Sequence, residues 1–181
     1  MSKFFDRITP ELHDFITSQH LFFVATAASN GRINLSPKGL SNTLKILDAN
    51  RLLWLNLTGS GNETAAHLLQ NNRMTIMFCS FEDKPLILRL YGTGKIYHER
   101  DNAFKKHIAL FPEIPGTRQL IDMTIESVQT SCGFAVPLMD FKEERLQLNN
   151  WAAKQGKTRI EAYWKEKNTT SIDGFDTNIF D

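Results

Sequence analysis

The sequence predicts an α+β domain, mainly β, whose antiparallel strands form a barrel. About six or seven segments have strand patterns, and hairpin turns rather than helices join most of them, unlike the alternation of a doubly wound parallel sheet. The longest segment, residues 86–97, contains Gly92 and Gly94. Glycines within a strand mark the bends or bulges that a barrel needs. The 181 residues suit a single domain, 1–181, that is large enough to bury a core.

The composition is that of an ordinary globular protein, with 41% hydrophobic and 23% charged residues. The formal net charge of +1 provides no general attraction to nucleic acid or to an anionic membrane. No apolar run is long enough to span a bilayer, and the first residues lack the apolar region of a signal peptide. We therefore expect a cytoplasmic protein that binds neither nucleic acid nor membrane.

The first third of the chain predicts a helix and a hairpin. Thr9-Pro10-Glu11 has the residue types of a helix start, and the helix should extend to about residue 19. Residues 21–28 and 32–37 are predicted strands, joined by a turn at Ser29-Asn30-Gly31. Lys38 follows at the sheet margin, where an ammonium group could meet a ligand phosphate, although most lysines in such places are simply solvated.

Residues 53–69 predict a strand, a glycine-containing turn and the start of a helix that ends near residue 71. Two interpretations of the turn compete. Ser60 and Glu63 have the spacing of a capping box, in which each side chain binds the other residue's backbone N–H. Alternatively, the free N–H groups of the helix start hold a phosphate. The local sequence favours the cap, because the motifs of P-loops and of dinucleotide-binding turns are incomplete.

The rest of the chain continues the sheet and ends in helices. Residues 129–133 form a polar kink, which is either a satisfied bulge or a rim that faces a ligand. Residues 142–181 should form a helical extension packed on the barrel, with a break at Gly156. The predicted strands are 73–80, 86–97, 120–128 and 134–138, and the predicted helices are 101–110, 142–155 and 158–167.

Motifs of several enzyme classes are missing. The five histidines and two cysteines show no metal-binding spacing, so we predict no metal site. Gly59-Ser60-Gly61 is too short for the nucleophile elbow of a serine hydrolase. No side chain identifies itself as a catalytic acid or base, so the catalytic residues stay unassigned.

The order of these segments resembles the pyridoxamine 5'-phosphate oxidase-like family of FMN-binding split barrels. Four stretches carry the resemblance, which extends over about residues 10–137: residues 31–39, 53–69, 73–78 and 88–92. The resemblance implies a six-stranded antiparallel split barrel of Greek-key type. It also implies a homodimer with FMN in clefts between protomers, and a flavin-dependent oxidoreductase acting on a small molecule.

The resemblance also assigns residues to the cofactor by position. Lys38 falls near the polar edge or phosphate of the flavin, and Leu57-Thr58 take the place of a Tyr-Thr pair. Asn62-Glu63-Thr64 stand where the family uses Ser-Arg-Lys to hold the phosphate. The implied cofactor-binding residues are Asn34, Ser36, Lys38, Leu57, Thr58, Ser60, Asn62, Glu63, Thr64, Arg89, Gln129 and Ser131.

Three departures argue against oxidation of vitamin B6. Glu63 and Thr64 replace the basic pair, and Ile87 stands in place of a flavin-contacting glutamine. The C-terminal Arg-Leu-x-Pro signature is also missing, since residues 145–148 lack the proline. Two alternatives therefore stay open: a flavin- or haem-binding stress-response protein without turnover, and a deazaflavin-dependent reductase on the same fold.

Overall fold

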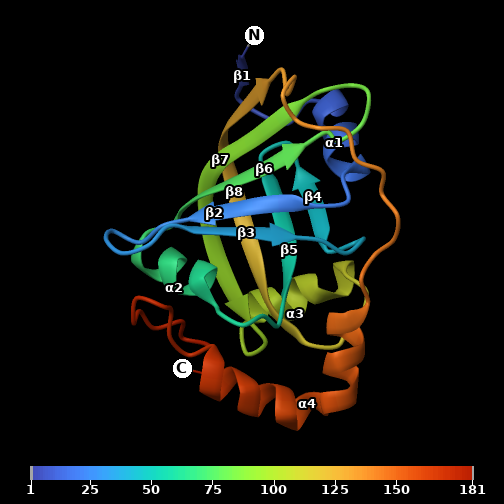
Figure 1. The fold of residues 1–181 in the computed structure, drawn as a ribbon. Helices are drawn as coiled ribbons and strands as arrows, with labels where there is room; N and C mark the ends of the chain where they lie inside the picture. The colour runs from blue at the N-terminus through green and yellow to red at the C-terminus, as the bar shows by residue number, and fades with distance from the viewer. Residues whose placement is uncertain (1, 181) are drawn as a thin grey trace.

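The computed structural model describes residues 2–180 and contains an antiparallel sheet of eight strands that curls around a core (Figure 1). The strands are β1 (Lys3–Phe5), β2 (Phe22–Thr26), β3 (Asn34–Lys38), β4 (Leu44–Asp48), β5 (Arg51–Leu57), β6 (Arg73–Cys79), β7 (Ile87–His98) and β8 (Thr117–Ser131). The helices are α1 (Pro10–Ser18), α2 (Glu63–Gln70), α3 (Asn102–His107), the 3-10 turn Ile108–Leu110, and α4 (Gln147–Lys167).

The strand order is β3-β2-β6-β7-β8-β5-β4, and β1 pairs with β8 outside this path. All neighbouring strands are antiparallel. The mainly β split-barrel prediction is therefore confirmed. Two strands, β1 and β4, exceed the predicted six: β1 has only three residues, and the burial of β4 does not alternate along the strand.

The predicted strand at 134–138 is wrong. Val136 N–H donates to Gly133 O in a turn, and Phe134 is 82% exposed. Pro137 has no N–H for a ladder hydrogen bond. Residues 132–146 instead run along the outside of the barrel from the end of β8 to α4 (Figure 1).

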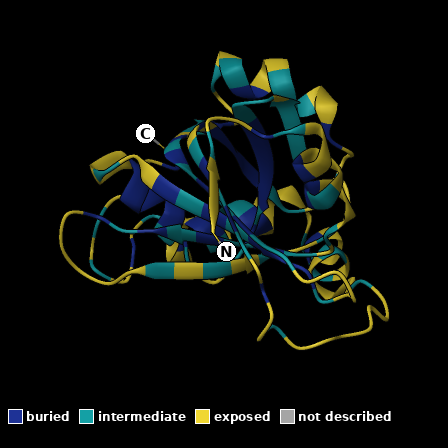
Figure 2. Cartoon of the chain, turned by 90° about the horizontal axis from the view of Figure 1, so that it is seen from above, coloured by how far each residue is buried: buried dark blue, intermediate teal, exposed yellow. Residues whose placement is uncertain are grey.

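The main core fills the barrel, and α1 closes one end of it. Figure 2 shows the buried residues gathered inside the sheet. Leu12 and Ile16 of α1 join the apolar residues of the sheet's inner face in one cluster. Thr9 begins this helix as predicted, because its Oγ1 accepts a hydrogen bond of 3.4 Å from Leu12 N–H.

The C-terminal part of the chain has its own small apolar cluster, formed by Ala152, Ile160, Trp164 and Ile179. Gly156 interrupts α4 with φ 71° and ψ 167°, which agrees with the predicted break. The helix begins at Gln147 rather than at residue 142. No helix within residues 2–180 has the length and apolar character needed to cross a membrane.

An ion pair joins β5 to β8 outside the main core. Arg51 donates to both carboxylate oxygens of Asp122, over 3.0 and 2.6 Å, and Tyr97 donates to the same carboxylate over 2.8 Å. Burial alone would raise the pKa of Asp122. The hydrogen bonds from Arg51 and Tyr97 outweigh this effect and hold the pKa below its ordinary value.

This arrangement predicts a pH-dependent effect of Asp122→Asn. A depressed carboxyl pKa stabilises the fold above the unfolded-state pKa, and that contribution is lost as pH falls through the folded-state pKa. At pH 7 the variant should lose about 1–3 kcal/mol of unfolding free energy, and the difference should shrink below about pH 4. Urea unfolding at several pH values measures it, with the exposed Asp83→Asn as control. A pH-independent difference would contradict the assignment.

Candidate functional site

A cleft of about 1250 Å³ lies between β3, β5, the loop before α2 and the C-terminal segment. Leu57, Phe141 and Ile172 provide apolar surface, whereas Trp54 and Leu55 border the cleft with side chains buried in the cores. The loop side is polar. Nine of the residues that the resemblance assigned to the cofactor line this cleft: Asn34, Ser36, Lys38, Leu57, Thr58, Ser60, Asn62, Glu63 and Thr64. The fold thus gathers around one space three segments that are separate in sequence.

The other three assigned residues lie outside the cleft of their own chain. Arg89 Nη1 donates to Ser131 Oγ over 3.3 Å, and Gln129 Oε1 accepts from the Tyr91 hydroxyl over 2.8 Å. Residues 129–131 continue β8 and pair with β1 and β7. Residues 129–131 are therefore regular strand rather than a bulge, and the side chains of Arg89, Gln129 and Ser131 form a cluster of their own.

The loop before α2 does not contain the predicted capping box. Asn62, not Ser60, is the N-cap residue, and its side chain makes no capping hydrogen bond. Asn62 Oδ1 instead accepts from Gln119 Nε2 over 3.0 Å, and Asn62 Nδ2 donates to Asn168 O over 3.3 Å. The first-turn N–H groups of α2 are therefore left without a side-chain cap.

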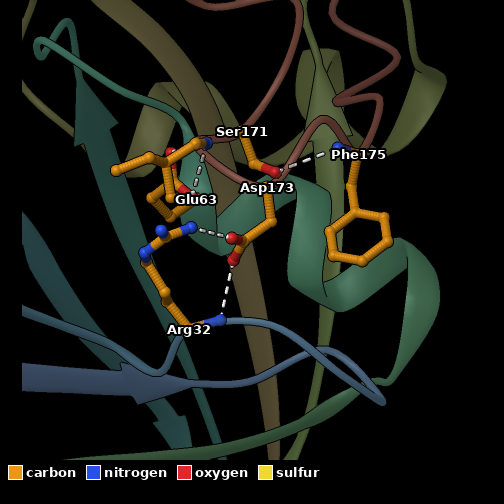
Figure 3. Close-up of polar contacts among 6 residues, drawn as sticks. Arg32, Glu63, Ser171, Asp173 and Phe175 are labelled. Atoms are coloured by element: carbon orange, nitrogen blue, oxygen red, sulfur yellow. Dashed lines mark hydrogen bonds and ion pairs between the residues drawn. The ribbon is translucent and has the colours of Figure 1, made fainter.

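Glu63 reaches from the loop, where its carboxylate lies beside Gly61, to the C-terminal segment (Figure 3). Its carboxylate accepts from Ile172 N–H at 3.1 and 3.2 Å. Next to it, the Asp173 carboxylate accepts from Arg32 N–H over 2.7 Å and pairs with the Arg32 guanidinium. The capping-box prediction is wrong because a backbone donor distant in sequence binds the Glu63 carboxylate.

The segment after α4 is a wall of the cleft. Thr170, Ser171 and Ile172 line it. Ser171 Oγ accepts from Phe175 N–H over 3.1 Å, which holds the turn in shape (Figure 3). The sequence indicates a polar tail with a turn at residues 171–174, which the structure contains. Its contacts with Arg32 and Glu63 could not be predicted, because these residues lie more than a hundred positions earlier in the chain.

A hydrogen-bonded network fixes the polar side chains of β3. Ser36 Oγ donates to Asn34 Oδ1 over 2.7 Å. Asn34 Nδ2 donates to Thr26 Oγ1 and to Thr64 Oγ1, both over 3.2 Å. Thr26 Oγ1 in turn lies 3.2 Å from Nδ1 of the buried His67. This network orients Asn34 and Thr64 before any ligand enters.

Four lysine and arginine residues line the cleft, Lys38, Arg118, Arg145 and Lys167, and of these only Lys167 forms a salt bridge within residues 2–180. Lys38 Nζ lies 5.5 Å from the centre of the Trp54 ring. Burial lowers the pKa of the Lys38 ammonium to about 8, and the positive charge of Arg118 adds to this effect. Neither Lys38 nor Arg118 forms a salt bridge within residues 2–180.

Arg118 is the lining residue that sequence reasoning missed. It is only 5% exposed, and burial lowers the pKa of its guanidinium to about 10. Nη1 donates to Gly61 O over 2.9 Å and to Asn168 Oδ1 over 2.7 Å, whereas Nε is buried without a partner among the described residues. The sequence signal that could have found Arg118 is its charge, two residues before the predicted strand 120–128.

Residues 141–148 form the outer rim of the cleft. Phe141 stacks on His20 with ring centres 3.7 Å apart and planes 10° from parallel. Glu144 Oε1 accepts from both the N–H and the hydroxyl of Ser41, each over 2.6 Å. These contacts attach the segment between β8 and α4 to the edge of the barrel.

Comparison with known proteins agrees with this architecture. Residues 8–132 match the family described as pyridoxamine 5'-phosphate oxidase. The pyridoxamine 5'-phosphate oxidase family protein ustO of Aspergillus flavus is 40% identical over 144 residues, which cover 77% of this chain and 58% of that protein. The chain thus spans somewhat over half the length of this relative.

Two solved structures share the fold. One is a Clostridium acetobutylicum protein related to general stress protein 26 of B. subtilis, of the pyridoxinephosphate oxidase family. It has TM-score 0.52, 20% identity and coverage of 67% of this chain and 86% of its own. The other is the FAD binding protein from Mycobacterium smegmatis, with TM-score 0.50, 13% identity and coverage of 70% and 97%.

The family match extends from the residue before the Thr9 helix cap to the end of β8. It therefore includes β2 to β8 and the barrel side of the cleft, whereas α4 and the segment after it lie beyond the match. On the match over residues 8–132 and the split-barrel fold, the chain belongs to the pyridoxamine 5'-phosphate oxidase family.

Proposed function

We propose that the cleft binds FMN and that the protein is a flavin-dependent oxidoreductase acting on a small molecule. The observation that carries this proposal is the convergence of β3, β5 and the start of α2 on one cleft of about 1250 Å³. Nine residues that the family resemblance relates to the cofactor line it. The FAD binding protein with the same fold supports a flavin as the ligand class.

The side chains present fit a ligand with a flat body and an anionic end. The half-buried Leu57 and the exposed side chains of Phe141 and Ile172 offer apolar surface to a ring system. Lys38 and the uncapped N–H groups of α2 offer charge and donors to a phosphate. When bound, FMN supplies the redox chemistry, and the protein binds and orients it and shields it from water.

We further propose a homodimer with the cofactor at the protomer interface. β3 is an edge strand with two exposed apolar side chains beside or within it, Ile33 at 77% and Leu35 at 64% exposure. The cluster of Arg89, Gln129 and Ser131 lies outside its own cleft and is available to a second copy. Light scattering after size-exclusion chromatography tests this proposal, and a monomer that binds FMN fully would contradict it.

Reconstitution tests the cofactor. Purified protein incubated with FMN and then desalted should retain the flavin absorption bands with one FMN per protomer. Parallel incubations with haem and with a deazaflavin separate the related alternatives, and colourless protein that takes up no FMN would exclude the proposal. Reduction of the bound flavin by NADH or NADPH, with substrate turnover, distinguishes an oxidoreductase from a binding protein.

Substitutions in the cleft should weaken FMN binding. Lys38→Ala should raise the Kd by roughly tenfold to a hundredfold, since a charged hydrogen bond contributes about 1.5–3 kcal/mol. Thr64→Ala should raise it less, because its hydroxyl is neutral. Fluorescence titration of FMN measures both, with the exposed Lys95→Ala as matched control. Unchanged affinity for FMN in both cleft variants would contradict the placement of the phosphate near Lys38 and Thr64.

A further inference from the structure

We propose that Arg118 is the main fixed positive charge that holds the anionic group of the ligand, in place of the basic pair that Glu63 and Thr64 replace. This inference rests on the proposed FMN site and deepens it, because it names the residue that would select a phosphorylated flavin. Arg118 stands at the start of β8, far in sequence from the loop and helix start that the resemblance relates to the phosphate.

The position of Arg118 relative to the loop carries the first step. Its Nη1 donates to Gly61 O, so the guanidinium lies against the loop that leads into α2. Arg118 lines the cleft although only 5% of its surface is exposed. An anion bound at the start of α2 would therefore meet both the guanidinium and the free N–H groups of the helix.

The second step is the missing counter-charge. Arg118 and Lys38 both line the cleft, and Arg118 is near enough to lower the pKa of Lys38. Three carboxylates line the same cleft, and none of them pairs with Arg118 or Lys38: Glu63 accepts from Ile172 N–H, Glu144 accepts from Ser41, and Glu143 is exposed. A buried guanidinium beside a half-buried ammonium, with no carboxylate paired to either, is costly, and a bound anion would offset that cost.

The third step concerns the unused donors of Arg118. A purely structural role, in which Arg118 ties Gly61 to Asn168, needs only Nη1. It leaves Nε buried without a partner within residues 2–180, and it gives no reason for a full charge at a position where a neutral amide could donate. A phosphate in the cleft would give a reason for the charge, because an anion interacts more strongly with a guanidinium than with a neutral amide.

The experiment compares FMN with riboflavin, which has the same ring system without the phosphate. Kd values for both are measured for the wild-type protein, Arg118→Gln and Arg118→Lys. The wild-type protein should prefer FMN, and Arg118→Gln should lose roughly tenfold to a hundredfold of that preference. Arg118→Lys should keep part of it. The ratio of the two Kd values isolates the phosphate, because loss of folded protein weakens both ligands alike.

Arg100→Gln is the matched control, because Arg100 also donates to backbone carbonyls of the C-terminal segment, those of Asn178 and Ile179, yet does not line the cleft. Its preference for FMN should equal that of the wild-type protein. An unchanged preference in Arg118→Gln would overturn the inference.

Failure of the proposed function gives a different result, namely wild-type protein that binds neither flavin. Inorganic phosphate is then the probe. A rise in Tm with phosphate that is present in the wild-type protein and absent in Arg118→Gln would support the anion site, and equal shifts in the two proteins would overturn it.

Discussion

Gly92→Ala should cost about 4 kcal/mol or more of unfolding free energy and leave little folded protein at 37 °C. A Cβ added at Gly92 would lie 1.9 Å from the carbonyl oxygen of Thr124 and 3.1 Å from the Cα of Ile125. Both are backbone atoms of β8, so no rotamer change relieves the clash. To relieve the clash, β7 and β8 would have to separate, although they pair along the whole length of β7.

The location explains why a glycine is needed. The β7–β8 register shifts between Tyr91 and Gly92: Tyr91 pairs with Ser127 and Gly92 with Ile125, so that Glu126 has no partner. Such a bulge increases the local twist and bends the sheet, which allows a barrel to curl. The clash therefore falls at the point that shapes the sheet.

Gly94→Ala is the comparison on the same strand. Its added Cβ would meet Met74 Sδ at 2.5 Å and Leu68 Cδ1 at 2.9 Å. These are ends of flexible side chains that can move, so a loss of about 1–2 kcal/mol is expected. Urea unfolding followed by circular dichroism measures both variants. Equal stability of the two, or a Gly92→Ala protein as stable as wild type, would contradict the role given to the bulge.

Features with a local cause could be predicted from the sequence. The Thr9-Pro10 helix start, the turn around Asn30 and the break at Gly156 follow from backbone preferences of single residues. The bend at Gly92 follows in the same way. Alternation of apolar residues located β5 and β7, because each of these strands has a buried side and is long enough to show the period.

Features that depend on distant partners could not be predicted from the sequence alone. Ser60 and Glu63 have the spacing of a capping box, but Ile172 N–H binds the Glu63 carboxylate instead. Residues 134–138 are apolar enough for a strand but pair with no neighbour. Arg118 belongs to the cleft only because β8 passes beneath the loop at Gly61. In each case the deciding contact joins residues that no local pattern relates.

The same dependence on distant contacts makes Asn168 a sensitive position. Its side chain is fully buried, with Nδ2 donating to Gly59 O over 3.1 Å and Oδ1 accepting from Arg118 over 2.7 Å. Its backbone carbonyl accepts from Asn62 Nδ2 and from Thr177 Oγ1. Asn168, the first residue after α4, thus joins the loop before α2, the buried Arg118 and the C-terminal wall of the cleft.

Asn168→Ala should therefore lower the unfolding free energy by about 2–4 kcal/mol, because it leaves Gly59 O without its donor and removes one of the two acceptors of the buried Arg118 guanidinium. Asn168→Asp keeps the acceptor for Arg118 and loses only the donor to Gly59, so it should be less destabilised. Asn150→Ala, on an exposed part of α4, should change stability by less than about 0.5 kcal/mol. Chemical unfolding of the three variants ranks them.

The same substitution should also weaken FMN binding, even though Asn168 does not line the cleft. Arg118 and the loop at Gly59 would lose a shared anchor, and a ligand that needs both in place would have to order them on binding. The rise in Tm on adding FMN should therefore be smaller in Asn168→Ala than in wild type, since a higher Kd reduces the stabilisation at a given ligand concentration. An equal rise in Tm would show that Asn168 supports the fold without positioning the anion site.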